Sequence, residues 1–432
     1  MNALTVAESP ILTDESALLR RFLAWAPQAP APDRAQAISA LARAYLYCDL
    51  RPETRADAEI ALTRTLDDPE PRVRRALAEA FASAAEAPRH VVLALAGDVS
   101  EVSRAVLALS PLLSDADLVD CAAMGDAVAQ TAIARRARLA APVAAALAEI
   151  GERAAVLVLI GNGQADLRSP ALWRLFERFS RDADVRSRLI ERPRLPASLR
   201  AAIVAATTAD VSQFAHGWLD PRRTERIARD GREQAFVAIA ADCGADELAE
   251  LVAWLRAREH LTVGLLVRTL SCGGVALFAQ SLADMAGLAA PRVAGVLRDP
   301  RGQAFASLYA RAGLPDRFLP AFRVAVACAT GAEVSLGVDY ALTMRILRAV
   351  EAQDNSDLTA VVAMLWRLAG ESAREEAREF VAAEAASAPA LALTEAGPMA
   401  PPVLLLNVEP GNENLAPPVT LDLTLAPVSI AA

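Results

Sequence analysis

Apolar residues recur at helical spacing in the first half of the chain, most clearly within residues 67–84. They follow the series i, i+3, i+4, i+7, i+8 and i+11, and they are Val73, Ala76, Leu77, Ala80, Phe81 and Ala84. This series places one apolar stripe along a helix. Asp68 and Pro71 suit the start of that helix, because a carboxylate accepts hydrogen bonds from the unpaired amides of a first turn and proline lacks an amide. We therefore expect a helix to begin near Pro71.

A second apolar stripe lies just before this helix. It consists of Ala58, Leu62 and Leu66, again at helical spacing. Two helices that are joined by an Asp/Pro turn and have one apolar side each cannot bury that side alone. The pattern therefore predicts a helical hairpin that is repeated along the chain.

Leucines at related positions extend the pattern past this hairpin. They are Leu113, Leu139, Leu167 and Leu195, separated by 26, 28 and 28 residues. Each leucine follows a short polar stretch and precedes an apolar helical pattern, which is typical of helical arrays. No alternating pattern of the kind found in strands competes with it. We expect an all-α fold with a solenoid of helical repeats over residues 33–206.

Residues 68–76 (DPEPRVRRA) resemble the inner turn and second helix of a HEAT repeat. The resemblance covers about one repeat well, and later copies are shorter and lack the Val-Arg pair. It implies that Asp68 and Arg74 take part in a polar ladder between successive repeats.

Three further segments resemble an uncharacterised HEAT-like family of alphaproteobacteria, a domain of unknown function. They are residues 106–119 (VLALSPLLSDADLV), 132–139 (AIARRARL) and 191–199 (ERPRLPASL). The resemblance extends to about residue 327. It implies no activity, no catalytic residue and no cofactor.

The spacing of apolar residues changes along the chain, and these changes indicate four parts. Residues 1–32 form an N-terminal helix and a Pro-rich linker, and residues 33–206 form the HEAT-like solenoid. Residues 207–386 form a second, irregular α-helical domain with short helices interrupted by proline and glycine. Residues 387–432 form a Pro/Ala-rich tail that we expect to be disordered, because its composition has no helical period.

Composition limits the class of protein. Although 54% of the residues are apolar, no run of about 20 residues lacks a charge, and the most apolar window, residues 261–283, contains Arg268. The N-terminus has no pattern of a signal peptide. Five widely spaced cysteines favour buried free thiols over disulfides or zinc. We expect a cytoplasmic protein without a membrane partner.

Residues 282–299 (LADMAGLAAPRVAGVLRD) resemble a bacterial-repressor helix-turn-helix. The positions that would reach base edges hold Ala, Pro and Gly, which cannot make the paired hydrogen bonds that direct readout requires. Arg292 and Arg298 could still contact phosphates. A helix–helix corner inside a helical domain is the simpler interpretation.

Arginines are dense between residues 168 and 200. Nine arginines and four acidic residues give this segment a charge of +5, whereas the whole chain carries −9. A basic stripe on a solenoid is one way to bind nucleic acid. The candidate contacts are Arg174, Arg178, Arg181, Arg186 and Arg188. Solvated arginines on a repeat surface are the alternative.

Enzymatic chemistry has little support. His90, His216 and His260 are isolated in the sequence, and no phosphate-binding loop, nucleophile elbow or metal-ligand spacing is present. A base-excision enzyme is the weakest hypothesis, since Trp173 and Phe176 share one helical side and only Glu177 accompanies them. We expect no catalytic residue, no cofactor and no metal.

The sequence therefore favours a non-catalytic scaffold that binds a protein or peptide partner. Arg74, Arg104 and Arg135 are the arginines that we expect to be exposed toward that partner. DNA binding through the arginine-rich segment or the helix-turn-helix-like corner is the second hypothesis.

Overall fold

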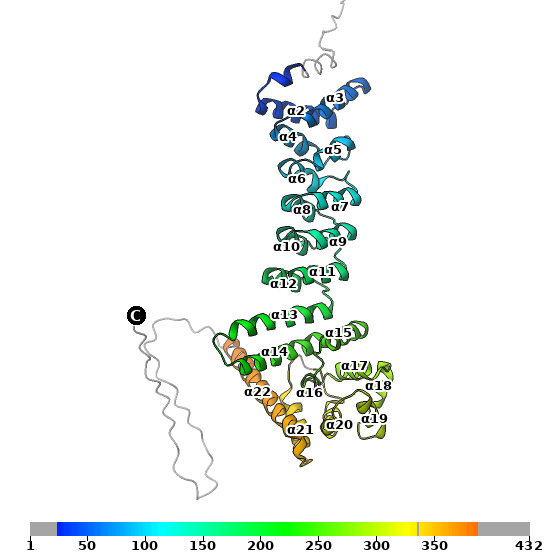
Figure 1. The fold of residues 1–432 in the computed structure, drawn as a ribbon, viewed down its shortest axis with the longest axis vertical. Helices are drawn as coiled ribbons and strands as arrows, with labels where there is room; N and C mark the ends of the chain where they lie inside the picture. The colour runs from blue at the N-terminus through cyan, green and yellow to red at the C-terminus, as the bar shows by residue number, and fades with distance from the viewer. Residues whose placement is uncertain (1–23, 335–336, 388–432) are drawn as a thin grey trace, which may run out of the picture. The chain divides into compact units, whose positions relative to one another are not determined.

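The computed structural model describes residues 24–334 and 337–387, and these residues form α-helices without any strand (Figure 1). The one β-type pairing among them is an isolated bridge between Leu139 and Ala165. The expected all-α fold is confirmed. Most of the helix expected in residues 1–32 and the tail from residue 388 onward lie outside the described residues. The chain divides into two compact units, Met1–Ser372 and Ala373–Ala432, and the stacked helices belong to the first.

The first half of this unit consists of short helices that stack in two layers (Figure 1). In one layer, α4, α6, α8, α10 and α12 contact one another in succession, and α2 packs on α4; in the other layer, α7, α9 and α11 do the same. The helices are α2 (Ala31–Tyr47), α3 (Pro52–Arg64), α4 (Pro71–Phe81), α5 (Arg89–Ala96), α6 (Ser100–Leu109), α7 (Asp115–Met124), α8 (Ala127–Ala134), α9 (Ala141–Ile150), α10 (Arg153–Gly161), α11 (Ser169–Phe179) and α12 (Ala183–Ile190), with the short 3₁₀ helices η1 (Ala26–Gln28) and η2 (Thr65–Asp67).

The second half is less regular. Its helices are α13 (Ala197–Ala215), α14 (Pro221–Ala241), α15 (Ala245–Ala257), α16 (Val263–Ser271), α17 (Val275–Ala286), α18 (Ala290–Val296), α19 (Gln303–Arg311), α20 (Leu319–Ala329), α21 (Tyr340–Glu351) and α22 (Thr359–Ser387), with η3 (Asp316–Phe318) and η4 (Ser356–Leu358). Here α13 packs on α14 and α15, and α16 packs on α14, α17 and α20.

Local sequence explains where these helices begin. Helix α4 starts at Pro71, as expected, and Asp68 accepts a hydrogen bond from the amide of Glu70 at 3.0 Å. Ser114 and Asp117 form a reciprocal capping box at the start of α7, and Asp182 accepts bonds from the first amides of α12. Each of these contacts satisfies donors that a helix leaves unpaired at its N-terminus.

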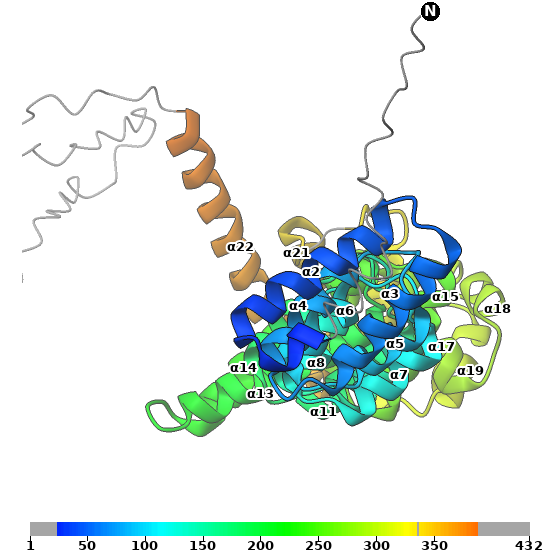
Figure 2. The ribbon, with the colours of Figure 1, turned by 90° about the horizontal axis from the view of Figure 1, so that it is seen from above.

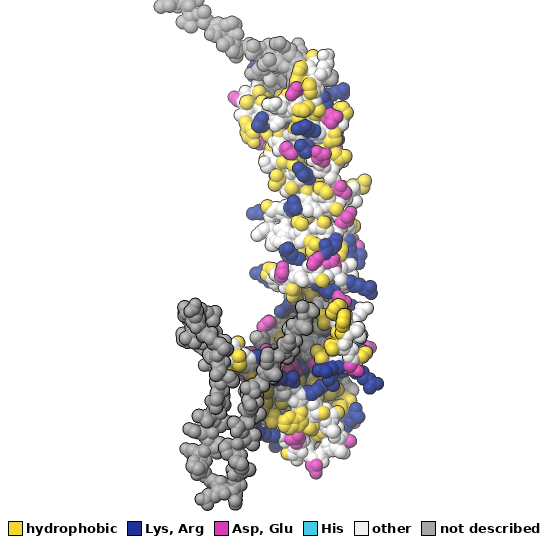
Figure 3. Space-filling model, turned by 90° about the vertical axis from the view of Figure 1, so that its left-hand side faces the viewer, with side chains coloured by type: hydrophobic (Ala, Val, Ile, Leu, Met, Phe, Trp, Pro, Cys, Tyr) yellow, Lys and Arg dark blue, Asp and Glu magenta, His cyan; other side chains and the backbone are white. Residues whose placement is uncertain are grey.

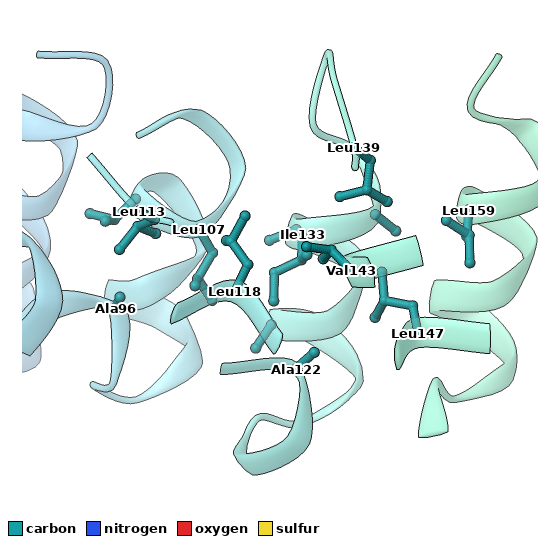
Figure 4. Packing of buried hydrophobic residues seen from close by; sticks show 14 of the residues in the cluster. Ala96, Leu107, Leu113, Leu118, Ala122, Ile133, Leu139, Val143, Leu147 and Leu159 are labelled. Carbon is teal, nitrogen blue, oxygen red and sulfur yellow. The ribbon is translucent and has the colours of Figure 1, made fainter. Parts of the chain in front are cut away.

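One continuous apolar core runs through the stack. Figure 4 shows buried side chains of α6, α8, α9 and α10 along the stack, among them Leu107, Ile133, Leu147 and Leu159. Among the four periodic leucines, Leu113, Leu139 and Leu195 are buried and Leu167 is half-buried. Since each helix is apolar on the side that faces its neighbours, the stack buries what a single hairpin would leave exposed.

Polar contacts also join successive hairpins. Arg34 forms a two-pronged ion pair with Asp68, with both N–O distances 2.8 Å. Arg74 does the same with Asp98 at 2.6 and 2.8 Å, and it also donates to the backbone oxygen of Asp68. Asp68 and Arg74 therefore link successive hairpins, as expected. Figure 3 shows positive and negative side chains side by side along the stack.

Other arginines cap the C-terminal ends of earlier helices. Arg136 donates to the carbonyl oxygens of Leu107 and Ser110 at the end of α6, both at 2.7 Å. Arg192 donates to the carbonyls of Ile160 and Asn162 at the end of α10 in the same way. These carbonyls lack partners within their own helices, so a cation placed there satisfies them and complements the helix dipole.

The boundary expected between residues 206 and 207 falls inside α13. The early residues of α13 contribute to the stack core, for example Leu199 and Ile203, and also to a smaller cluster that contains Phe236 and Leu251. The domain division stays a prediction.

All five cysteines are free thiols. Cys272 is buried, but Cys48 is exposed at the end of α2, which corrects the expectation that all are buried. Within the described parts of the chain, no helix is both long enough and apolar enough to cross a membrane.

Candidate functional site

Helices α13 and α14 are longer than the helices that they pack against. They contain 19 and 21 residues, whereas α12 contains 8 and α15 contains 13. The turn between them consequently projects to the side of the stacked helices (Figure 2). In the described part of the chain, side chains near this turn are more than half exposed on both helices, for example Phe214 on α13 and Ile227 on α14.

Three adjoining hollows have volumes of about 540, 400 and 420 Å³; the first lies at the α11–α12 turn, and the other two are lined by residues of α13. The first two share Ser180 and Arg181, and the last two share Ala209 and Gln213. We call this continuous feature the α13 groove. It is lined by Arg178, Phe179, Ser180, Arg181, Asp182, Ala206, Thr208, Ala209, Asp210, Ser212, Gln213, His216, Glu225, Ala228, Arg229 and Arg232.

The acidic side chains of the groove are largely neutralised from outside it. Asp182 pairs with Arg153 at 2.5 Å, and Arg153 holds the pKa of that carboxyl below its usual range. Asp210 pairs with Arg186 at 2.7 Å. Neither arginine lines the groove, so the positive charges of the groove's own arginines are not cancelled by these two carboxylates.

Two arginines of the groove are available to a ligand. Arg181 and Arg229 are exposed and make no hydrogen bond or salt bridge to any residue that the structure describes. Glu225 is the remaining acidic side chain of the groove. A guanidinium group presents several donors in one plane and binds carboxylates with two parallel hydrogen bonds.

Arg178 and Arg232 are more enclosed. Arg178 donates to the carbonyl oxygens of Ala148 and Gly151, and burial lowers its pKa. Burial also lowers the pKa of Arg232, and its buried Nε has no hydrogen-bond partner among the described residues. A buried donor without an acceptor is unfavourable, so an acceptor in the groove would stabilise this guanidinium.

The polar side chains of the groove include four arginines, three carboxylates and one histidine. His216 lies 3.3 Å from the Ser212 hydroxyl through its Nε2, within one turn of the same helix. In the described residues, no three His, Cys, Asp or Glu side chains are placed to hold a metal ion. The arrangement can hold carboxylate or phosphate groups through its arginines.

The three arginines expected at a partner surface have different surroundings. Arg104 on α6 and Arg135 at the end of α8 are exposed. Arg74 has only 14% of its side chain exposed, because it is held between Asp98 and the backbone of Asp68. This corrects the expectation that its guanidinium is exposed.

The arginines proposed as nucleic-acid contacts do not form one open stripe. Arg174 pairs with both carboxylate oxygens of Glu149 at 2.7 Å, Arg178 caps α9, and Arg186 is buried against Asp210. Arg181 and Arg188 are exposed. Three of these five arginines are thus engaged inside the chain, which sequence spacing did not show.

The helix-turn-helix-like residues form a compact corner. Helix α17 ends at Ala286, Gly287 adopts a left-handed conformation with φ 64°, and α18 follows with Val293 buried. Arg292 and Arg298 are exposed on this corner. The left-handed backbone at Gly287 explains why glycine occupies the turn.

A second polar cluster joins residues that are distant in the sequence. His90 Nε2 lies 2.9 Å from the Thr63 hydroxyl, and its Nδ1 lies 3.8 Å from Glu59, in a hollow of about 620 Å³. The order hydroxyl–imidazole–carboxylate resembles a nucleophile triad. However, the Thr63 hydroxyl donates to the backbone oxygen of Glu59 at 2.8 Å, so His90 is not placed to remove its proton.

The grouping considered for a base-excision enzyme is part of the core surface. Trp173 and Phe176 pack edge to face with their ring centres 6.1 Å apart, and both lie against the core of the stack. Glu177 is exposed and 3.6 Å from Arg174. These residues line neither the α13 groove nor the hollow beside His90.

Sequence reasoning missed most of the groove. Gln213, Arg229 and Arg232 come from two helices, and nothing in their local pattern distinguishes them from other solvated positions. A usable signal was the unusual length of the two helices, because an end without cover exposes residues that would otherwise be core.

Residues 102–354, more than half of the chain, match the model of a family described as "Uncharacterised protein conserved in bacteria (DUF2336)". This agrees with the expectation of a bacterial family of unknown function. Neither a curated protein nor a solved structure matches the chain.

Proposed function

The chain belongs to this bacterial family, and we propose that it is a non-catalytic, HEAT-like helical-repeat scaffold that binds an acidic segment of a partner protein in the α13 groove. We also propose that it acts in the cytoplasm, which five free cysteines favour. The proposal is supported by three features, which are the stack of helices, the polar α13 groove and the exposed arginines that line this groove.

The observation that carries the proposal is the imbalance of charge in the groove. Asp182 and Asp210 pair with arginines outside the groove, while Arg181 and Arg229 make no hydrogen bond or salt bridge to a described residue. The buried Nε of Arg232 adds a donor that lacks an acceptor. A carboxylate-bearing segment would supply the missing charge and the missing acceptor.

The stack suits the role of a support. Its ion pairs and arginine caps join each hairpin to the one before it, for example Arg74 to Asp98 and Arg136 to the end of α6. A series of hairpins held in this way presents a fixed surface, so a partner binds with little loss of conformational freedom in the scaffold.

DNA binding is the second candidate, because Arg181, Arg188, Arg292 and Arg298 are exposed. Against it, Arg174, Arg178 and Arg186 are engaged inside the chain. The contact positions of the α17–α18 corner carry no side chain that reads a base.

A binding titration separates the two candidates. Fluorescence anisotropy would follow the wild-type chain with a labelled glutamate-rich peptide, a lysine-rich peptide of equal length and a DNA duplex. The proposal predicts binding of the acidic peptide alone. Arg181→Glu combined with Arg229→Glu should weaken that binding about tenfold or more, since each change replaces an attraction by a repulsion.

Arg72→Glu is the matched control, because Arg72 is exposed on α4 and remote in sequence from the groove. It should leave peptide binding unchanged. Binding of the DNA duplex would favour the DNA candidate instead if it weakens steeply with salt. The logarithm of the binding constant should then fall by about 0.9 for each phosphate contacted when the salt concentration rises tenfold. Equal loss in the control and the groove variant would contradict a specific site.

A further inference from the structure

Large apolar side chains in the turn between α13 and α14, and on both helices beside it, are more than half exposed. Phe214 is 77% exposed and Trp218 is 81% exposed, and Val211, Leu219 and Ile227 are more than half exposed. We call these five residues the hairpin tip. None of them lines the α13 groove.

The position of these side chains is unusual. Trp218 and Leu219 lie in the turn itself, beyond the end of α13 at Ala215. Turns at the end of a helical hairpin are ordinarily polar, because they face water. Val211 and Phe214 extend the apolar surface from the turn back along α13, at spacing i and i+3. Figure 2 shows that this turn projects beyond the helices of the stack.

Three arginines follow the apolar residues in the first turns of α14. Arg222, Arg223 and Arg226 are exposed, and no hydrogen bond or salt bridge from their side chains to a described residue is present. Cations at a helix N-terminus are disfavoured by the helix dipole, so these arginines do not serve the stability of α14. The local acids are Asp220, which caps the helix by accepting from the amide of Arg223, and Glu225, which faces the groove.

We propose that the hairpin tip docks on the surface of an anionic phospholipid membrane. Trp218, Phe214 and Leu219 would enter the boundary between headgroups and acyl chains, where aromatic rings are favoured. Arg222, Arg223 and Arg226 would lie at the level of the phosphates and pair with them. Charge complementarity favours this occupant, because cations flank the apolar side chains on the helix that continues from the turn.

A second copy of the chain fits the tip less well. Symmetric pairing through the tip would bring the arginines of both copies close together, and like charges across an interface are unfavourable. A projecting apolar turn also matches a deformable lipid surface better than a flat protein surface. The contact is peripheral, because it involves the tip alone. The proposal differs from the expectation of no membrane partner, which rests on the lack of a segment apolar enough to span a membrane.

Flotation of the full chain with vesicles tests the proposal. One set of vesicles contains phosphatidylcholine alone, and the other contains phosphatidylcholine with phosphatidylglycerol. The wild type should float with the anionic vesicles and should not float with the neutral ones. Phe214→Ser combined with Trp218→Ser should weaken binding about tenfold or more, since both apolar groups leave the interface. Arg222→Gln, Arg223→Gln and Arg226→Gln together should weaken it roughly fivefold for each charge removed.

Met124→Ser is the matched apolar control, because Met124 is 89% exposed at the end of α7. It should float like the wild type, and circular dichroism should show unchanged helix content in every variant. Trp218→Phe should remove a blue shift of tryptophan fluorescence that the wild type shows on anionic vesicles.

Either of two flotation results would overturn the proposal. One is absence of the wild type from floated anionic vesicles; the other is flotation that the tip variants do not change. A tip variant that converts a dimer to a monomer in light scattering, without any effect on vesicles, would assign the tip to a second copy. The groove variant with Arg181→Glu and Arg229→Glu should still float, so the two proposals can fail separately.

Discussion

Arg268 donates hydrogen bonds from its two terminal nitrogens to the two carboxylate oxygens of Glu371, both at 3.1 Å, although 103 residues separate them in the sequence. Arg268 has only 1% of its side chain exposed, in the middle of α16, and Glu371 lies on α22. Glu233 and Asp230 of α14 are each 4.0 Å from the same guanidinium. One buried cation therefore connects three helices.

Removing the partner of this buried arginine should destabilise the fold. Glu371→Ala should lower the free energy of unfolding by about 3 kcal/mol, at the low end for a broken buried pair because Glu233 and Asp230 stay near the charge. Urea unfolding followed by circular dichroism measures it. Replacing three groups together, with Arg268→Met, Glu371→Gln and Glu233→Gln, should recover most of the loss, because no buried carboxylate is then left without its cation.

Glu375→Ala is the matched control on the same helix. Glu375 is exposed, and its salt bridge in the described part of the chain is with Arg378 of the same helix, so its loss should cost about 0.5 kcal/mol or less. The interpretation of the buried cation is wrong if Glu371→Ala and Glu375→Ala have the same small effect.

Glu233 should give the protein an unusual dependence on pH. Burial raises the pKa of its carboxyl above the ordinary value of 4.5, against the hydrogen bond from Thr262 and the charge of Arg268. The folded chain thus binds this proton more tightly than the unfolded chain does. Its contribution to stability therefore increases as the pH falls through the raised pKa toward 4.5.

Glu233→Gln removes this titration. We therefore expect the wild type to gain stability relative to the variant as the pH falls from neutral to 4.5. The measured quantity is the difference between their free energies of unfolding. A difference that stays constant over this range would show that Glu233 titrates alike in both states.

The ion pair between Arg74 and Asp98 should stabilise the stack. Arg74→Ala should cost about 2–3 kcal/mol, because it leaves Asp98 half-buried without its partner and frees the carbonyl of Asp68. Arg72→Ala, at an exposed position of the same helix, should stay within about 0.5 kcal/mol of the wild type. Thermal unfolding of both variants measures these costs. Equal stability of the two variants would show that the contact between Arg74 and Asp98 does not stabilise the stack.

This pair has an acid dependence opposite to that of Glu233. Arg74 lowers the pKa of Asp98 below its ordinary value of 3.8. The stabilisation is present above the ordinary value and is lost as the pH falls through the lowered one. Arg74→Ala and wild type should therefore approach each other in stability only at strongly acidic pH.

Two leucines of α6 allow a direct comparison of core and surface. Leu107 is fully buried and Leu109 is 60% exposed. Leu107→Ala should cost about 2–5 kcal/mol, since it leaves a cavity between neighbouring helices. Leu109→Ala should change the free energy of unfolding by about 0.5 kcal/mol or less. Equal costs would mean that α6 does not pack as described.

The regular part of the fold could be predicted because its signals are local. The stripe that begins at Val73 and the Asp-Pro turn before it determine one helix and the side that it buries. The same spacing around Leu113, Leu139 and Leu195 recurs in the next hairpins. Each of these signals comes from residues that lie within a few positions of one another, so it can be recognised in the sequence itself.

Long-range electrostatics could not be predicted in the same way. Arg186 and Arg188 look alike in the sequence, yet one is buried against Asp210 and the other is exposed. Arg268 interrupts the most apolar window of the sequence, but residue spacing does not identify its partner on α22. Phe214 and Trp218 resemble core residues in the sequence, and only the structure shows that they are 77% and 81% exposed.

Photo-crosslinking in living cells from position 213 tests the central claim most directly. Gln213 lines two of the three hollows of the α13 groove, so a photoreactive residue there should capture a partner. The proposed function predicts adducts with protein segments rich in Asp and Glu, which disappear when Arg181→Glu and Arg229→Glu are added. Adducts with nucleic acid, or protein adducts that persist unchanged with those two substitutions, would contradict it.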